Sequence, residues 1–435
     1  MNSYSNRLAY EPLHVQDGYA AHALGRMLQY ISEHSTFYRE LLSAQGVDTR
    51  SIKTLKDIQG LPFTTKTDMQ LRNWDFLCVP GQSVREYTAT SGTMGKPVTI
   101  ALTAGDLDRL AYNESQSFRC ADGEAEDVYQ LALTLDRQFM AGIAYYSGIR
   151  AMDATLVRTG PGLPEMQWET IRRLQSTTLV AVPSFLLAMA DWATANSIDP
   201  LGSTVKKAVC IGESLRRADF SPSALAEQIE SKWPIKLYNT YAATELQTAF
   251  TECGAGRGGH HQPDLVIVEI IDDAGQVVSD GVPGEVVVTT LGIEGMPLLR
   301  YRTGDIAALH AEPCSCGRLS RRLGPVIGRK GQMIKYRGTT IYPPAIFDIL
   351  NEAPYITGYL VEVYTGAQET DELRIHLHTA IPVDDCDRQL RILLQSGLRV
   401  VPALQYHAGA EMHAMSMPPG SRKQVRFIDN RGLYG

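Results

Sequence analysis

The sequence predicts an α/β protein with a large N-terminal domain and a small α+β C-terminal domain. The chain has 435 residues, more than one compact domain usually holds. From Tyr87 onward, β-like runs alternate with amphipathic segments, which is typical of folds built on a mainly parallel sheet. After Gly328 the pattern changes to short strands with one helix. We therefore expect domains at 1–328 and 329–435.

The elements of the large domain follow in order along the chain. Residues 17–60 have helical periodicity, and Gly46 closes a later helical run. The apolar face of the first helix comprises Leu24, Met27, Leu28 and Ile31. Strand-like runs follow as VYQLALTL, TLVAVPSF and VKKAVCIG, with helical segments between them. VIVEIID and EVVVTT flank the turn-rich DDAGQVVSDGVPG, which predicts antiparallel strands forming a β-rich subdomain.

The small domain has a different pattern of predicted elements. YLVEVYTG and ELRIHLHT are strand-like, and DRQLRILLQ is helical.

Apolar residues make up 44% of the chain and charged residues 20%, as in ordinary globular enzymes. No apolar run approaches a membrane span, and the N-terminus has no secretory pattern, so we expect a cytoplasmic protein. A net charge of -7 argues against nucleic acid and membrane partners.

The stretch TATSGTMGKPVTI, residues 88–100, is rich in glycine and hydroxyl residues. Glycines leave backbone N–H groups uncovered, as in loops that hold phosphate oxygens. The candidate phosphate-binding residues are Ser91, Gly92, Thr93, Gly95 and Lys96. The loop is not a Walker A motif, because Pro97 follows the lysine where a Ser or Thr is required. A flexible turn between two strands is the alternative.

Three further stretches fit the same site. They are TYAATE (240–245), LLRYRTGD ending at Asp305, and GRKGQMIKYRG beginning at Gly328. In this order they resemble the motifs of adenylate-forming enzymes, most closely the phenylacetate–coenzyme A ligase family. The opening segment FYRELLSAQGVDTRSIKTLKDIQGLPFTTKTDMQ and the closing RKQVRFIDNR are also similar to that family. The resemblance implies that ATP and a carboxylic acid give an acyl adenylate, from which the acyl group passes to the thiol of coenzyme A.

The resemblance implies roles for the TYAATE stretch. Glu245 would bind Mg²⁺, Thr244 the α-phosphate, and Tyr241 would stack on adenine. Oxygen ligands suit a hard cation. Taken alone, Tyr241 is more often a buried core aromatic. Ala242, where the family has glycine, would narrow the acyl pocket.

The resemblance also implies nucleotide contacts elsewhere. Asp305 would accept hydrogen bonds from the ribose, Arg329 would reach the ribose and phosphate, and Lys423 would meet the carboxylate and α-phosphate during adenylation. A turn-capping aspartate and a solvated basic tail are the plain alternatives. Gly331 stands at the usual hinge position. In CIGES, the residues Gly212, Glu213 and Ser214 resemble the loop that contacts adenine.

Seven cysteines in a cytoplasmic chain do not indicate a disulfide framework. Cys314 and Cys316 form a C-x-C pair, and Cys253 precedes His260 by seven positions. Together they could form a Cys₃His structural zinc site, with His261 as the spare ligand. Some members of the resembled family carry similar cysteines and histidine. Two unrelated surface pairs are the alternative.

An acyl pocket is expected around QFMAGIAYYSG, residues 138–148. The candidates are Phe139, Met140, Ala141, Tyr145 and Ala242, and a flat apolar cavity would suit an aromatic acid. Each could equally be a core residue. Two rival functions stay open: loading of a carrier protein or amide formation, and a nucleotide-binding protein that has lost catalysis. The second is motivated by three departures from the family's pattern: Met94 in place of a hydroxyl residue, Ala242 in place of glycine, and Gly331 in place of an aspartate or lysine. A homodimer is also left open.

Overall fold

The computed structural model describes residues 7–90, 97–366, 370–418 and 424–431. The chain divides into two compact units. The larger comprises Met1–Pro222, Ala226–Thr303 and Ala307–Pro325, and the smaller comprises Ser223–Leu225, Gly304–Ile306 and Val326–Gly435. The helices are α1 (Leu13–His34), α2 (Thr36–Ala44), α3 (Lys66–Leu71), α4 (Ala104–Cys120), α5 (Met140–Ala151), α6 (Pro164–Leu174), α7 (Pro183–Ala195), α8 (Ala224–Lys232), α9 (Pro343–Glu352), α10 (Val383–Leu398) and α11 (Gly409–Ser416).

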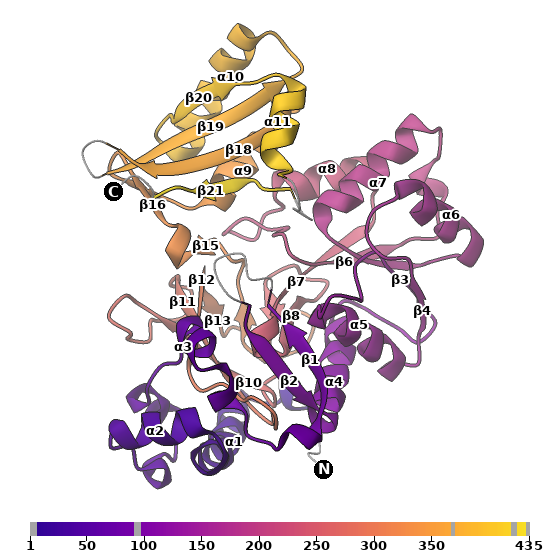
Figure 1. The fold of residues 1–435 in the computed structure, drawn as a ribbon. Coiled ribbons are helices and arrows are strands. Elements are labelled where there is room, and N and C mark those ends of the chain that lie inside the picture. The colour runs from indigo at the N-terminus through magenta and orange to yellow at the C-terminus, as the bar shows by residue number, and fades with distance from the viewer. Residues whose placement is uncertain (1–6, 91–96, 367–369, 419–423, 432–435) are drawn as a thin grey trace. The chain divides into compact units, whose positions relative to one another are not determined.

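The strands follow the N-terminal helices, beginning at Val84 and continuing to Asp429 (Figure 1). They are β1 (Val84–Ala89), β2 (Thr99–Thr103), β3 (Val128–Leu131), β4 (Thr155–Arg158), β5 (Thr178–Ala181), β6 (Lys207–Cys210), β7 (Lys236–Ala243), β8 (Thr248–Glu252), β9 (Gly259–His260), β10 (Val266–Ile271), β11 (Gly284–Thr290), β12 (Tyr301–Ala307), β13 (Leu309–His310), β14 (Arg322–Leu323), β15 (Gly328–Arg329), β16 (Ile334–Tyr336), β17 (Thr339–Ile341), β18 (Ile356–Thr365), β19 (Asp371–Thr379), β20 (Ala403–Tyr406) and β21 (Phe427–Asp429).

The largest sheet of the larger unit has the order β13-β14-β9-β8-β7-β6-β5-β3-β4. Strands β4, β3, β5, β6 and β7 run parallel, and β8, β9, β14 and β13 continue the sheet with antiparallel pairs. Every residue of β5 is buried, as expected for a parallel strand covered on both faces. The predicted α/β class is therefore confirmed, and the pairing of β10 with β11 confirms the predicted antiparallel strands.

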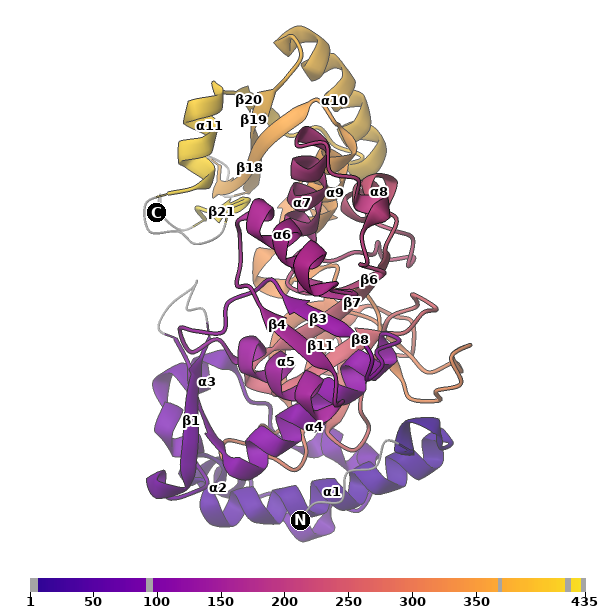
Figure 2. The ribbon, with the colours of Figure 1, turned by 90° about the vertical axis from the view of Figure 1, so that its right-hand side faces the viewer.

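Helices α4 and α5 pack closely together beside this sheet (Figure 2). Gly148 permits the close approach, because a Cβ at this position would lie 2.3 Å from the Cβ of Glu114. The two helices share a buried apolar cluster with strands β3, β5, β6 and β7. Its members include Phe118, Tyr129, Leu131, Tyr145, Ile149, Val180, Val209 and Tyr238.

The N-terminal helices form as the sequence predicts. The apolar face of α1 is buried at Leu24, Met27, Leu28 and Ile31. Gly46 follows α2 with φ +61°, a left-handed conformation that favours glycine. The segment after α2 is tied to a distant part of the unit by Arg300, which is buried. Arg300 donates to Glu269 through two nitrogens, at 3.0 and 2.9 Å, and to the carbonyls of Gln59 and Leu61.

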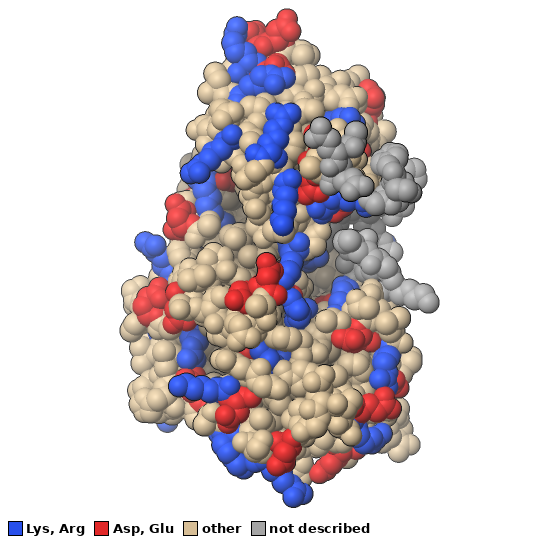
Figure 3. Space-filling view, turned by 90° about the vertical axis from the view of Figure 1, so that its left-hand side faces the viewer, with Lys and Arg blue, Asp and Glu red and all other residues tan. Residues whose placement is uncertain are grey.

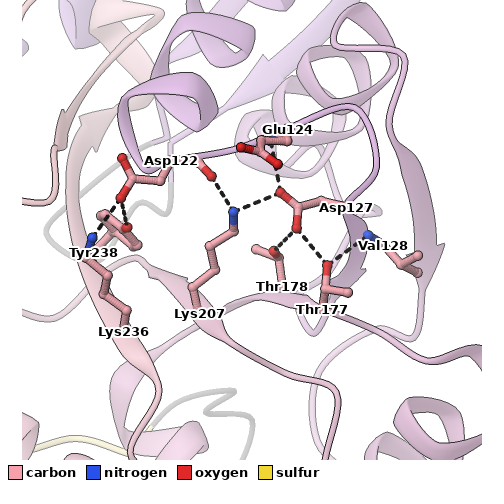
Figure 4. A network of polar contacts seen from close by, with 9 residues as sticks. All are labelled: Asp122, Glu124, Asp127, Val128, Thr177, Thr178, Lys207, Lys236 and Tyr238. Carbon is pink, nitrogen blue, oxygen red and sulfur yellow. Dashed lines mark hydrogen bonds and ion pairs between the residues drawn. The ribbon is translucent and has the colours of Figure 1, made fainter.

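A polar network joins the amino ends of the parallel strands (Figure 4). Lys207, the first residue of β6, lies 2.8 Å from the Asp127 carboxylate, which also accepts from Thr177 at 2.8 Å. Lys236, the first residue of β7, lies 2.7 Å from Asp122. These contacts fix the loop between α4 and β3 to the strands. The opposite, carboxyl ends of the same strands remain for the candidate site.

The smaller unit is an α+β structure around the sheet β20-β19-β18-β21. Strands β18 and β19 are antiparallel, whereas β21 and β20 pair with them in parallel. The predicted runs YLVEVYTG, ELRIHLHT and DRQLRILLQ fall in β18, β19 and α10. Helices α9 and α10 share its core, which includes Ile346, Leu350, Val361, Leu373, Ile375, Leu390 and Leu394. This confirms the small α+β part of the predicted fold.

Among the helices in the part of the chain that the structure describes, none combines the length and apolar character of a membrane span. On the face drawn in Figure 3, basic and acidic side chains are scattered among other residues, which cover most of the surface.

Candidate functional site

Two of the predicted stretches lie at the carboxyl ends of neighbouring parallel strands. CIGES follows β6, and TYAATE covers the end of β7 and the 3₁₀ turn Thr244–Leu246. In open α/β sheets, ligands bind at the carboxyl ends of the strands. The network of Figure 4 lies at the other ends, so the larger unit separates a structural edge of the sheet from a candidate binding edge.

Glu245 is the buried acidic residue of the binding edge. It is 7% exposed, and its Oε1 lies 3.2 Å from the ammonium nitrogen of Lys66. Tyr301 donates a hydrogen bond to the same oxygen at 3.3 Å. A carboxylate is the kind of oxygen ligand that Mg²⁺ takes beside waters and substrate phosphates. These residues therefore fit the predicted magnesium site, and the ion itself stays a prediction.

Lys66 was not singled out by the sequence analysis. It begins α3, behind a capping box in which Thr65 and Asp68 satisfy each other's backbone N–H groups. Thr64 fixes this start, because its N–H donates to Arg300 O at 3.1 Å and its carbonyl accepts from Arg302 N at 2.9 Å. The stretch PFTTKTDM belongs to the segment that carries the resemblance, so a lysine there was an available signal.

The other residues of TYAATE have distinct environments. Tyr241 is partly buried, and its ring lies 5.7 Å from that of Phe250 on the paired strand β8. Ala242 is exposed and Thr244 partly exposed. Tyr241 is thus neither a fully buried core aromatic nor a free surface ring, and its contact with adenine stays a prediction.

Two residues of CIGES, Glu213 and Ser214, have structural partners in the larger unit, and a third has a special backbone conformation. Gly212 adopts φ +77°, a left-handed conformation in which a residue with a side chain would be strained. Glu213 accepts a 2.8 Å hydrogen bond from the N–H of Ser184, in the first turn of α7. The hydroxyl of Ser214 donates to Arg216 O at 2.9 Å. Glu213 therefore satisfies the helix terminus, and the predicted adenine contacts of this loop stay predictions.

The glycine-rich loop and the C-terminal lysine lie outside the described residues. This applies to Ser91, Gly92, Thr93, Gly95, Lys96 and Lys423. The residues on either side of the loop are joined, because Thr90 N donates to Val98 O and Val98 N donates to the Thr90 hydroxyl, each at 3.0 Å. Strands β1 and β2, which flank it, are paired antiparallel as expected for the strands on either side of the loop.

Two predicted nucleotide residues meet in the smaller unit. Asp305 pairs with Arg329 across β12 and β15, and the Arg329 Nε lies 3.0 Å from the Asp305 carboxylate. Asp305 is 5% exposed, whereas the Arg329 side chain is 63% exposed. Gly331 lies in the 3₁₀ turn Lys330–Gln332, where its carbonyl accepts from Arg431 at 3.1 Å.

The predicted acyl-pocket residues lie at and after the start of α5. Tyr145 belongs to the buried apolar cluster, with its ring 5.8 Å from that of Phe118. Met140 is buried, whereas Phe139 and Ala141 are partly exposed. The interface between α4 and α5 also contains Glu114, which the sequence did not indicate. Burial raises the pKa of Glu114 to about 8, although Asn113 donates a hydrogen bond to its carboxyl group.

The structure brings the predicted zinc ligands together. One ligand atom from each of Cys253, His260, Cys314 and Cys316 lies within 4.8 Å of the other three. The sulfurs of Cys253 and Cys314 are 3.5 Å apart, and the Cys316 sulfur is 3.5 Å from His260 Nε2. The spare ligand, His261, instead contacts Arg321 O through Nδ1 at 2.9 Å.

The protonation states of His260 and Cys316 suit metal binding, whereas burial raises the pKa of the Cys253 thiol. Burial, with nearby arginines, lowers the pKa of His260 to about 3, which keeps its imidazole neutral. Burial opposes ionisation of Cys316, yet hydrogen bonds from Arg318 bring its pKa below the usual value. Neutral imidazole and thiolate are the forms that bind zinc. Four protein ligands leave no open position, so the arrangement fits a structural ion.

Comparison with known proteins places these features in a wider group. Residues 79–294 match the family model described as AMP-binding enzyme. The chain is 30% identical over 364 residues to the phenylacetate-coenzyme A ligase of Aromatoleum evansii, covering 81% of this chain and 79% of that protein. It is 28% identical over 419 residues to the phenylacetate-coenzyme A ligase of Thermus thermophilus, covering 91% of each.

A solved structure shares the fold across both units. The structure of 2-hydroxyisobutyryl-CoA ligase in the postadenylation state, in complex with 2-HIB-AMP, matches with a TM-score of 0.85 and 21% sequence identity. The match covers 98% of this chain and 92% of that chain. At this identity the likeness shows the fold.

Proposed function

The chain belongs to the phenylacetate–coenzyme A ligase family of AMP-binding enzymes, and from this membership we propose that it activates an aromatic or arylacetic carboxylic acid. It is an AMP-forming acid–CoA ligase. In the first step the carboxylate attacks the α-phosphorus of ATP, which gives the acyl adenylate and pyrophosphate. In the second step the thiol of coenzyme A attacks the acyl carbon and AMP leaves. The proposed site of action is the cytoplasm.

The observation that carries the proposal is the environment of Glu245. The buried Glu245 carboxylate at the carboxyl end of β7 would provide an oxygen ligand for Mg²⁺, and the Lys66 ammonium beside it would provide positive charge for phosphate. When bound, the ion would neutralise charge on the phosphates. The chain's own groups would orient ATP there, with Thr244 at the α-phosphate and Tyr241 against adenine.

The smaller unit would supply further nucleotide contacts. Asp305 is nine-tenths buried or more and offers its carboxylate to ribose hydroxyls, while Arg329 is exposed and adjacent. We assign Lys423 to the carboxylate and α-phosphate during adenylation. The proposed domains, 1–328 and 329–435, would then change their relative orientation for thioester formation, with the segment around Gly331 as the hinge.

The aromatic substrate class rests on the α5 region. Phe139 and Ala141 expose part of their surface next to the buried cluster around Tyr145, and Ala242 is exposed at the end of β7. Apolar residues of this kind suit a flat ring. The carbonyl carbon would lie toward Thr244, where the carboxylate must meet the α-phosphate.

We also propose a structural zinc ion at Cys253, His260, Cys314 and Cys316. The support is the four convergent ligand atoms. The ion would join the strand pair β8–β9 to the segment before β14 and would take no part in catalysis.

The test of the function is acid-dependent release of pyrophosphate. Benzoates, aminobenzoates, hydroxybenzoates, arylacetates and heteroaryl acids are supplied with MgATP, with and without coenzyme A. We expect one aromatic class to give release that rises with coenzyme A, together with a thioester seen by mass. If pyrophosphate release does not change when coenzyme A is added, a carrier protein or an amine would be favoured as the acceptor. No release from any acid would contradict the proposal.

Two variants connect the activity to the site. Lys423→Ala is expected to abolish pyrophosphate release while retaining thioester formation from a synthetic acyl adenylate. The matched control is Lys335→Ala, an exposed lysine of β16 in the smaller unit, which should keep both steps. If K423A released pyrophosphate at the wild-type rate, the assigned role would be wrong.

A further inference from the structure

Lys66 is a charged residue of the site that neither the motifs nor the family comparison assigned. Its Nζ lies 3.2 Å from Glu245 Oε1, and its side chain is 46% exposed. Glu245, in contrast, is 9% exposed at its side chain. The ammonium group therefore neutralises a buried carboxylate and still has donors directed toward solvent.

The position of Lys66 is fixed by long-range contacts. Thr64 forms a parallel bridge with Tyr301, the residue whose hydroxyl donates to Glu245. The Thr64 hydroxyl also donates to Leu299 O at 2.6 Å. The backbone that carries Lys66 is thus joined to the strand that carries Tyr301, so both groups are held at the same carboxylate. A lysine that served only as a solvated surface charge would not need this support.

Binding of ATP at this site requires positive charge that balances the phosphates in addition to the Glu245 carboxylate. ATP brings the charge of three phosphates, and further negative charge develops on the departing pyrophosphate. A Mg²⁺ ion held by Glu245 would compete with the Lys66 ammonium, since both are cations attracted to the same carboxylate. A lysine released from its carboxylate beside a polyphosphate has an acceptor of opposite charge within reach of its flexible side chain.

We infer that Lys66 is a catalytic residue that binds the pyrophosphate portion of ATP, exchanging Glu245 for phosphate oxygens when MgATP enters. This inference rests on the proposed function, because it assumes that ATP binds at Glu245. It deepens that function by adding Lys66 to the candidate phosphate-binding residues. Lys66 would stabilise pyrophosphate as it leaves and would take no part in transfer of the acyl group to coenzyme A.

The test compares ATP with AMP, because only ATP carries the pyrophosphate portion. Binding of each nucleotide, with Mg²⁺ and without acid, is measured by calorimetry for the wild type, Lys66→Met and Lys66→Arg. We expect K66M to weaken ATP binding at least about tenfold and to leave AMP binding within about twofold. K66R should retain most of the affinity for ATP. The matched control is Lys56→Met, an exposed lysine of the same N-terminal region.

A double-mutant cycle separates direct phosphate binding from an effect through Glu245. In the Glu245→Gln background, a direct contact predicts that K66M still weakens ATP binding about tenfold. If the effect disappears in that background, Lys66 only positions the carboxylate and the inference is overturned. It is also overturned if K66M binds ATP as tightly as the wild type, or if ATP and AMP binding fall equally.

The two half-reactions provide a second readout. K66M is expected to slow pyrophosphate release at least about tenfold, whereas thioester formation from a synthetic acyl adenylate should stay near the wild-type rate. Equal loss of both half-reactions would contradict a role at pyrophosphate. Nucleotide binding is measured without any acid. A negative result for Lys66 can therefore be distinguished from a negative result in the acid panel, which tests the proposed function.

Discussion

Arg329 donates through Nε to Asp305 at 3.0 Å, so two residues expected to bind one nucleotide are bonded to each other. The pair lies across β12 and β15, with the carboxylate buried and the guanidinium mostly exposed. An exposed partner contributes little to folding, because water and salt screen the interaction. The arrangement holds both side chains ready for a ligand with hydroxyl and phosphate groups.

Arg329→Ala is therefore expected to change nucleotide binding more than stability. The free energy of unfolding should change by less than about 1 kcal/mol, as for other exposed ion pairs, whereas the KM for ATP should rise severalfold. Steady-state adenylation and urea unfolding measure the two effects. Arg388→Ala is the matched control, since Arg388 forms an exposed pair with Asp385 in the same unit. Equal effects of both variants on KM would exclude a specific role for Arg329.

The zinc proposal predicts a selective loss of metal. Cys316→Ser should reduce bound zinc well below one ion per chain and lower the free energy of unfolding by more than about 3 kcal/mol, because binding energy of a structural ion is folding energy. Plasma mass spectrometry and urea unfolding measure these effects. Cys120→Ala is the control, since Cys120 packs against the cluster but is not one of its four ligands. Wild-type protein purified without zinc would contradict the proposal.

Glu114 predicts a pH dependence of stability. Burial raises the pKa of this carboxyl group from 4.5 to about 8, so the folded state keeps a proton that the unfolded state loses above pH 4.5. Stability contributed by this group is therefore complete below pH 4.5 and falls as pH rises toward 8, by at most about 1.4 kcal/mol per unit.

Glu114→Gln removes that titration. Compared with the wild type, the variant should lose less stability between pH 5 and pH 8. Urea unfolding at several pH values measures the two slopes, and Glu169→Gln, at an exposed position of α6, is the control. Parallel slopes for E114Q and the wild type would show that Glu114 is ionised in the folded protein.

The buried ion pair of Arg300 and Glu269 predicts a large loss of stability when one partner is removed. Both side chains are nearly inaccessible, and the guanidinium contacts the carboxylate through two nitrogens. Glu269→Ala leaves a buried positive charge, which should cost about 3–5 kcal/mol in the free energy of unfolding. Glu169→Ala, which breaks an exposed i,i+4 pair, should cost less than about 0.5 kcal/mol. Similar losses for the two variants would refute the argument from burial.

Sequence periodicity predicted the elements whose burial is set by local pattern. The face of α1, the buried strands β5 and β6, and the antiparallel pair β10–β11 all follow from the spacing of apolar residues. The convergence of Cys253 and His260 with Cys314 and Cys316 could also be proposed, because short ligand pairs restrict the geometry of a metal site.

The remaining site residues depend on contacts between distant segments. Lys66 approaches Glu245 only because Thr64 bridges to Tyr301, and no local pattern encodes that bridge. Glu114 lies beside Gly148 because two helices pack closely there, and its proton follows from that packing. Glu213 was predicted as an adenine contact, yet its hydrogen bond to Ser184 could be seen only once α7 had been positioned.

The cysteine cluster also has a consequence for the unfolded chain. Cys253 and Cys314 are 61 positions apart in sequence, although their sulfurs are 3.5 Å apart in the fold. An ion bound to both would close a loop that contains Glu269, Arg300 and Asp305. By the loop-entropy relation for covalent cross-links, closing a loop of this length disfavours the unfolded ensemble by about 4 kcal/mol. Supply of zinc would then affect how readily newly made chains reach the folded state, at a distance from any step of catalysis.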